Sequence, residues 1–213
     1  MINYIKTNRI YILLIFTLNI SCFKQDMNSS TNSELLRKYI QIAREEINLQ
    51  FETNKNKKFQ EINYISNNQG VFVRLLKNGK ERGCYGFFKN INSIDEAIKK
   101  SAINAAFFDP RFPELTENEL DKIEIQLTIV GKFEELHNKK QFIIGKDSLL
   151  IDDYSNRGIL QAPIAIEENY NKTQFLKALC RKAKLNESSY KLKYTKIYKA
   201  TSLYYKEPFN IDK

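Results

Sequence analysis

The clearest pattern along the chain is a pair of short apolar-rich runs on either side of an Asn-Gly pair at 78–79. An Asn-Gly pair in this setting is the strongest local signal for a two-residue β-hairpin of type I′. In the register that such a turn sets, Val73 lies opposite Cys84 and Leu75 lies opposite Arg82. Because alternate residues of a strand point to the same face, this pattern predicts that Arg82 and Cys84 share a face, about 7 Å apart along the strand.

The rest of the chain alternates between helical and strand periodicity. Helical spacing of apolar residues, or a capping box ahead of it, predicts helices over 34–49, from 94 to the residue before Pro110, and over 173–183. Alternating apolar and polar residues over 123–129 predict a half-buried strand with one wet or polar face. We also expect a hairpin or turn at 145–148 and one or two late strands over 194–205.

These elements predict an α+β fold, built on an antiparallel sheet with helices packed on it, either as one unit or with two lobes. The chain has 213 residues, of which 42% are hydrophobic, so it can bury a substantial core. We place this domain at 34–206, followed by a C-terminal tail at 207–213.

The N-terminus has the pattern of a targeting segment. Basic residues precede an apolar stretch over 10–18 that is too short to span a membrane as a helix. A small residue and then Cys22 follow, which resembles a bacterial lipobox. We therefore expect a lipoprotein signal peptide at 1–21, a lipidated Cys22 that anchors an extracytoplasmic protein to the membrane, and a flexible tether over 22–33. A cleaved secretory signal and an uncleaved anchor are the alternatives.

A formal net charge of +9 raises the question of nucleic acid as a partner. The lysines are dispersed along the chain and no aromatic–basic motif of a nucleic-acid module occurs, so no nucleic-acid binding is expected. Three cysteines and one histidine, without a Cys-x-x-Cys or His-x-x-x-His spacing, predict no metal site. The sequence has no Gly-rich phosphate loop or dinucleotide fingerprint, and no cofactor is expected.

Several segments together resemble the AMMECR domain family, over about residues 35 to 206. The family's hallmark is a Leu-Arg-Gly-Cys-Ile-Gly motif, which here reads Glu-Arg-Gly-Cys-Tyr-Gly at 81–86. Further matching segments are Gly-Val-Phe-Val at 70–73, Lys-Asn-Gly at 77–79 and Asp-Pro-Arg-Phe-Pro-Glu-Leu at 109–115. The sequence departs from the family at Lys184, where the family has a glycine that suits a helix C-cap. The resemblance implies the fold and a candidate site, and it implies no reaction.

Cys84 is the leading candidate for a functional residue. The cation of Arg82 on the same strand face would favour the thiolate, which is the reactive form of cysteine. The planar fork of Arg82 is also suited to binding a carboxylate or a phosphate. Each residue has a structural alternative, with Cys84 as a small buried hydrophobe and Arg82 as a partner in a salt bridge. Cys180 lies on the apolar face of a predicted helix, so we expect it to be structural and not bridged to Cys84.

Five further residues are expected near the same site. Gly83 and Gly86 flank the thiol and let a ligand or another stretch of backbone approach closely. Asp109 and Arg111 straddle a proline after the second helix, where they line the groove or hold their own loop through an ion pair. Glu167 lies in a predicted loop, where it acts as acid, base or ligand, or is a solvated carboxylate.

Three functions remain open from the sequence. The first is a binding or scaffold domain that uses a groove around residues 82–86, with a protein or a small anionic ligand as its partner. The second is a thiol-dependent enzyme in which Cys84 is the nucleophile, Arg82 clamps an anion, and Glu167 or Asp109 is the acid–base. The third is a structural surface lipoprotein. We favour the binding function, because an oxidising compartment disfavours a free thiol nucleophile.

Overall fold

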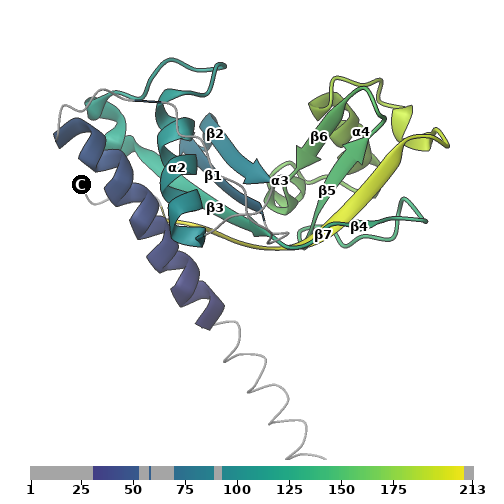
Figure 1. Cartoon of the computed structure of the whole chain (residues 1–213), viewed down its shortest axis with the longest axis horizontal. Coiled ribbons are helices and arrows are strands. Elements are labelled where there is room, and N and C mark those ends of the chain that lie inside the picture. The colour runs from purple at the N-terminus through teal and green to yellow at the C-terminus, as the bar shows by residue number, and fades with distance from the viewer. Residues whose placement is uncertain (1–30, 53–57, 59–69, 89–92, 209–213) are drawn as a thin grey trace, which may run out of the picture.

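The computed structural model describes residues 31–52, 58, 70–88 and 93–208, so the expected signal peptide and Cys22 lie outside the described residues. An antiparallel sheet curls through two lobes, and helices pack on it (Figure 1). This architecture confirms the predicted α+β fold. None of the helices in the described part of the chain is long and apolar enough to cross a membrane.

The strands in the described segments are ordered β2-β1-β3-β7-β5-β6, with the short β4 also paired to β7. They are β1 (Gly70–Lys77), β2 (Lys80–Phe88), β3 (Ile123–Val130), β4 (Glu134–Glu135), β5 (Asp147–Asp152), β6 (Arg157–Leu160) and β7 (Lys196–Lys206). The helices are an N-terminal helix over residues 31–52, α2 (Ile94–Phe107), α3 (Ala162–Glu167) and α4 (Lys172–Lys182), with 3-10 turns η1 (Glu117–Lys122) and η2 (Ser189–Lys191).

The long strand β7 joins the two lobes. Residues 202–206 of β7 pair with β3 in the first lobe, and residues 196–201 pair with β5 in the second. Figure 1 shows β7, in yellow, running along the base of both lobes. Each lobe has its own cluster of buried apolar side chains, with Leu75 in the first cluster and Phe175 in the second. The segment predicted as one or two late strands is therefore a single strand that holds the two halves of the fold together.

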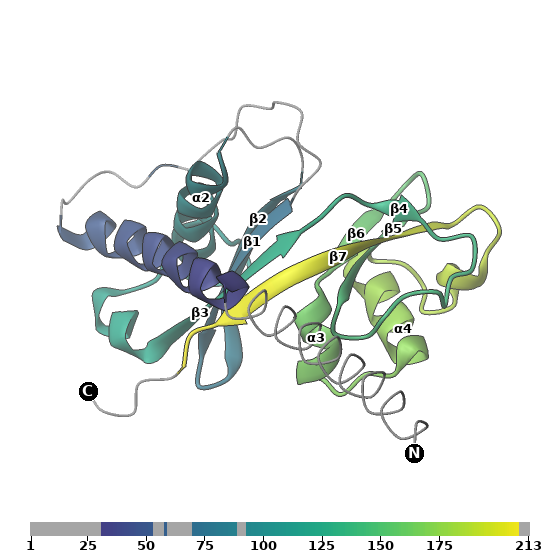
Figure 2. The same cartoon turned by 90° about the horizontal axis from the view of Figure 1, so that it is seen from below.

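The helices cover the sheet with the apolar stripes that the sequence predicts. The N-terminal helix includes the predicted 34–49 and buries its stripe: Leu36, Ile40, Ala43 and Ile47. Figure 2 shows α2 beside this helix on the first lobe. The rings of Phe51 and Phe107 lie 5.5 Å apart between their centroids. In the second lobe, α4 begins after the capping Asn171 and buries the predicted face, including Cys180.

The turn that was one alternative at 145–148 is present, because residues 144–146 form a turn that leads into β5. Two local expectations need correction. The strand β3 keeps a polar face but is not half-buried, because Glu124, Gln126 and Thr128 are all buried. Glu167 does not lie in a loop. It ends the short helix α3, which the sequence pattern does not predict, and which carries a proline in its first turn, where proline is tolerated.

The β1–β2 hairpin has the predicted turn but not the predicted register. Asn78 and Gly79 have φ values of +52° and +72°, as a type I′ turn requires. A β-bulge follows in β2. Leu75 pairs with Gly83 and the next residue of β1 pairs with Glu81, so Arg82 is opposite no residue of β1. One extra residue in a strand moves every later side chain to the other face. The sequence prediction that Arg82 and Cys84 share a face is therefore wrong.

Candidate functional site

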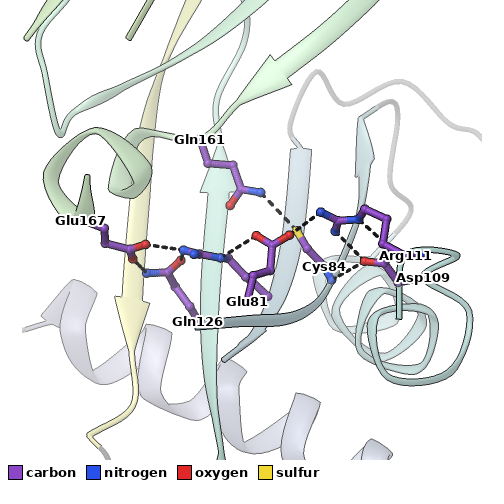
Figure 3. A network of polar contacts seen from close by, with 8 residues as sticks. Glu81, Cys84, Asp109, Arg111, Gln126, Gln161 and Glu167 are labelled. Carbon is purple, nitrogen blue, oxygen red and sulfur yellow. Dashed lines mark hydrogen bonds and ion pairs between the residues drawn. The ribbon is translucent and has the colours of Figure 1, made fainter. Parts of the chain in front are cut away.

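Cys84 lies opposite Arg74, and both residues line a cleft between the two lobes. The cleft has a volume of about 590 Å³. The β1–β2 hairpin forms one wall, and the segment from β6 through α3 to α4 forms the other, with Ile159, Gln161 and Ile164 among its lining residues. The side-chain amide of Gln161 donates to Cys84 Sγ across the cleft, at 3.6 Å (Figure 3).

The Cys84 thiol is protonated at neutral pH. Burial, and to a smaller extent the nearby carboxylate of Glu81, raise the pKa of Cys84 to about 11, against the opposing effects of Lys182, Gln161 and Arg74. With that pKa, only about 1 thiol in 10,000 is ionised at pH 7. The sequence expectation of a thiolate activated by a neighbouring cation is therefore not met, because the burial of the thiol outweighs the cations around it.

Arg82 forms a structural salt bridge on the opposite face of β2. Its Nε and Nη2 each donate to a carboxylate oxygen of Glu119 at 3.0 Å. Its terminal nitrogens also donate to the carbonyl oxygens of Pro113 and Glu114. The guanidinium holds the pKa of Glu119 well below its usual range. All the donors of Arg82 that could clamp an anion are thus directed at the 113–119 segment, away from the cleft.

Asp109 and Arg111 hold their own loop and fix the edge of β2. Arg111 donates from Nε and Nη2 to the two carboxylate oxygens of Asp109, at 3.0 and 2.6 Å. Asp109 also accepts the backbone N–H of Cys84 at 2.9 Å. Burial alone would raise the pKa of Asp109, but these donors together lower it. The Asp-Pro-Arg loop therefore positions the backbone beneath the thiol, and neither side chain lines the cleft.

A chain of ion pairs and hydrogen bonds continues from this loop into the second lobe (Figure 3). Glu81 accepts from Arg111 at 2.5 Å and from Arg74 at 3.0 Å. Arg74 also donates to Glu167 at 2.5 Å, and Gln126 donates to the other oxygen of Glu167 at 2.6 Å. Because Glu167 belongs to α3 while Arg74 and Gln126 belong to the first lobe, this carboxylate ties the two lobes together beside the cleft.

Gly83 and Gly86 serve packing within the first lobe. A Cβ at Gly83 would lie 2.1 Å from the carbonyl oxygen of Ala105, so α2 can approach β2 only over a glycine. A Cβ at Gly86 would lie 2.1 Å from the ring of Phe72. The close approach expected at these glycines is therefore made by the protein's own chain.

Of the candidate residues expected from the sequence, the structure brings Cys84 alone into the cleft lining. Sequence reasoning missed Arg74, Gln161 and Lys182, which also line it. The bulge in β2 that brings Cys84 opposite Arg74 has no signature in the hydrophobic pattern. Within the described residues, no cluster of three or more His, Cys, Asp or Glu side chains is arranged to hold a metal ion.

Comparison with known proteins agrees with this fold. The profile of the AMMECR1 family matches residues 40–203. A protein of Methanocella arvoryzae is 33% identical over 166 residues, covering 75% of this chain and 84% of the relative. A protein of Sulfolobus acidocaldarius is 32% identical over 188 residues, covering 83% of each chain.

A solved structure is similar over most of the chain. The crystal structure of uncharacterized protein PH0010 from Pyrococcus horikoshii superposes with a TM-score of 0.72 at 26% sequence identity. The match covers 82% of this chain and 92% of that one. The family profile spans both lobes, from the N-terminal helix to β7, and therefore includes the bulged hairpin and the cleft. The chain belongs to the AMMECR1 family.

Proposed function

We propose that this protein is a binding domain whose ligand occupies the cleft between the two lobes. The observation that carries the proposal is the cleft itself, about 590 Å³ in volume, with apolar side chains beside polar groups in its walls. Specific ligand sites commonly combine an apolar lining with a few polar groups that fix orientation. The ligand would contact Cys84 and Arg74 on the hairpin wall, and Gln161 with the aliphatic surface of Ile159 and Ile164 on the other wall.

The state of the side chains supports binding over thiol catalysis. A nucleophilic cysteine requires a lowered pKa, and burial raises that of Cys84 to about 11. Both carboxylate oxygens of Asp109 and of Glu167 already accept hydrogen bonds from the protein's own side chains. The residues expected to serve as acid and base are therefore occupied in holding the site together, and the expected nucleophile stays protonated at neutral pH.

We also propose that the domain is anchored to a membrane by a lipid on Cys22. The support is the sequence alone: basic residues, a short apolar stretch and a small residue before the cysteine. Metabolic labelling with palmitate tests this, because label should be incorporated into the wild type and not into Cys22→Ala. Equal labelling of the two proteins would refute the anchor and leave the cleft proposal intact.

A fragment screen by NMR tests the binding function directly. We expect weak ligands to shift the resonances of Ile159, Gln161 and Ile164 together. Ile164→Trp should fill the cleft and abolish these shifts. Ile143→Trp is the matched control, because Ile143 is 56% exposed and lies outside the cleft. The proposal is wrong if no fragment perturbs the cleft, or if the fragments bind Ile164→Trp as well as they bind the wild type.

A further inference from the structure

We infer that the cleft recognises an uncharged amide group, such as the backbone of a peptide segment, and not an anion. This inference rests on the proposed binding function and names the chemical class of its ligand. It follows from two buried polar side chains on opposite walls of the cleft, Arg74 and Gln161, each of which has unused hydrogen-bonding capacity among the described residues.

Arg74 offers an unused donor. Its side chain is 8% exposed, and its Nε and Nη1 are engaged by Glu81, Gln126 and Glu167. No hydrogen bond to Nη2 is made within the described part of the chain. Because Arg74 lines the cleft, the N–H groups of Nη2 are the part of this guanidinium that remains for a ligand. A guanidinium so deeply placed forms short, well-directed hydrogen bonds with an acceptor.

The charge around Arg74 selects the kind of acceptor. Two cations, Arg74 and Arg111, share three carboxylates, which belong to Glu81, Asp109 and Glu167. The positive charge of Arg74 is thus already compensated by its own partners, and an anion placed against Nη2 would lie beside the carboxylates of Glu81 and Glu167. The cleft lining as a whole carries more cations than carboxylates, so this repulsion acts locally, at Nη2. The repulsion of like charges is strong where water is largely excluded. A neutral carbonyl oxygen accepts from Nη2 without that repulsion.

Gln161 offers an unused acceptor. The residue is 8% exposed, its Nε2 donates to Cys84, and its Oε1 is buried with no hydrogen-bond partner among the described residues. A buried acceptor without a hydrogen bond is destabilising, so a ligand that donates to Oε1 is favoured. The terminal torsion of glutamine is soft, so its amide can rotate to present Oε1 to the cleft.

An amide group carries the complementary pair of groups. Its carbonyl oxygen accepts from Arg74 Nη2, and its N–H donates to Gln161 Oε1, while an attached aliphatic side chain packs against Ile159 and Ile164. The exposed cations that also line the cleft are Lys80, Arg181 and Lys182. A phosphate or carboxylate ligand would bind to these three groups, so an anion is the competing ligand class that the test must exclude.

NMR titration of the full chain with three probes tests the inference. The probes are N-acetyl-leucinamide, the aliphatic carboxylate 4-methylpentanoate, which has no amide, and inorganic phosphate. We expect N-acetyl-leucinamide to shift the resonances of Ile159 and Ile164, and the side-chain amide of Gln161 where it is present, in a saturable way, and the two anions to leave them unchanged. Arg74→Lys keeps the positive charge but loses the planar guanidinium and its Nη2 donor, and Gln161→Ala loses the Oε1 acceptor. Each variant should bind N-acetyl-leucinamide about tenfold more weakly, the effect of losing one hydrogen bond. Gln141→Ala, an exposed glutamine outside the cleft, is the matched control.

Two results would overturn the inference. If phosphate or 4-methylpentanoate saturates the cleft and N-acetyl-leucinamide does not, the ligand class is wrong while the binding function stands. If none of the probes shifts the resonances of Ile159, Ile164 and Gln161, the amide inference is also wrong, and the fragment screen then decides separately whether the cleft binds any ligand. If Arg74→Lys does not fold, Gln161→Ala still tests the hydrogen bond, and unchanged affinity in that variant contradicts the inference.

Discussion

Cys84 lies directly opposite Arg74 in the β1–β2 ladder, because the bulge at Arg82 shifts the register of β2 by one residue. Without the bulge, Cys84 would face Val73, and Arg82 would point toward the same side as the thiol. The shift instead places the thiol beside the buried guanidinium of Arg74, which donates to Glu167 of the second lobe. Arg82 lies on the other face of β2, where it donates to Glu119. The chemistry of the cleft therefore depends on one unpaired residue in an edge strand.

Arg82→Met should destabilise the protein without changing the reactivity of Cys84. The substitution removes both hydrogen bonds to Glu119, whose side chain is 13% exposed, and we expect a loss of about 1–3 kcal/mol in the free energy of unfolding. Urea unfolding measures the loss, and iodoacetamide alkylation at pH 8 measures the reactivity. A change of tenfold or more in the alkylation rate of the folded variant would show that Arg82 does act on the thiol.

The alkylation rate of Cys84 should keep rising above pH 9. The ordinary pKa of the thiol is 9.0 and the folded value is about 11, so the thiolate fraction grows about tenfold per pH unit up to that value. Unfolded chains ionise first, so the free energy of unfolding should fall as the pH rises from 9 to 11. Mass spectrometry of alkylated peptides at pH 7, 8, 9 and 10 follows the rate. A plateau by pH 9 would contradict the raised pKa.

Glu119 should make the protein sensitive to acid. Its folded pKa lies below the ordinary value because of Arg82, so the stabilisation is present above the unfolded pKa and is lost as the pH falls toward the folded one. Glu119→Gln should lower stability at pH 7 and reduce the loss of stability between pH 5 and pH 3. Thermal unfolding across this range is the measurement. An unchanged slope in the variant would mean that other carboxylates dominate the acid response.

Glu167→Ala should loosen the cleft. The substitution removes the carboxylate that accepts hydrogen bonds from Arg74 and Gln126 of the first lobe. The ion pairs that Glu81 makes with Arg74 and Arg111 stay in place. We expect alkylation of Cys84 to become several-fold faster, while Cys180, buried in the second lobe, serves as the internal reference for unfolding. Glu117→Ala, an exposed carboxylate in η1, is the control. Equal acceleration at both cysteines would indicate general destabilisation and not a local opening.

The fold was largely predictable from the sequence because periodicity reports burial directly. The stripe over 34–49, the alternation over 123–129 and the Asn-Gly turn each correspond to an observed element. The site was less predictable, because it depends on a bulge, which no hydrophobic pattern marks, and on α3, which is only six residues long. The departure from the family pattern at Lys184 did indicate a local feature of the backbone. Lys184 has a φ of +59° after α4, a conformation that suits the glycine of the family and is unfavourable for lysine.

Protection of Cys84 from alkylation tests the central claim most directly. The full chain is treated with iodoacetamide at pH 8 with increasing N-acetyl-leucinamide, and the modification of Cys84 and Cys180 is followed in the same sample. An occupied cleft should slow labelling of Cys84 in a saturable way, leave Cys180 unaffected, and give no protection in Ile164→Trp. A Cys84 rate that does not change with the probe, or that slows in parallel with Cys180, would contradict an amide-binding site between the lobes.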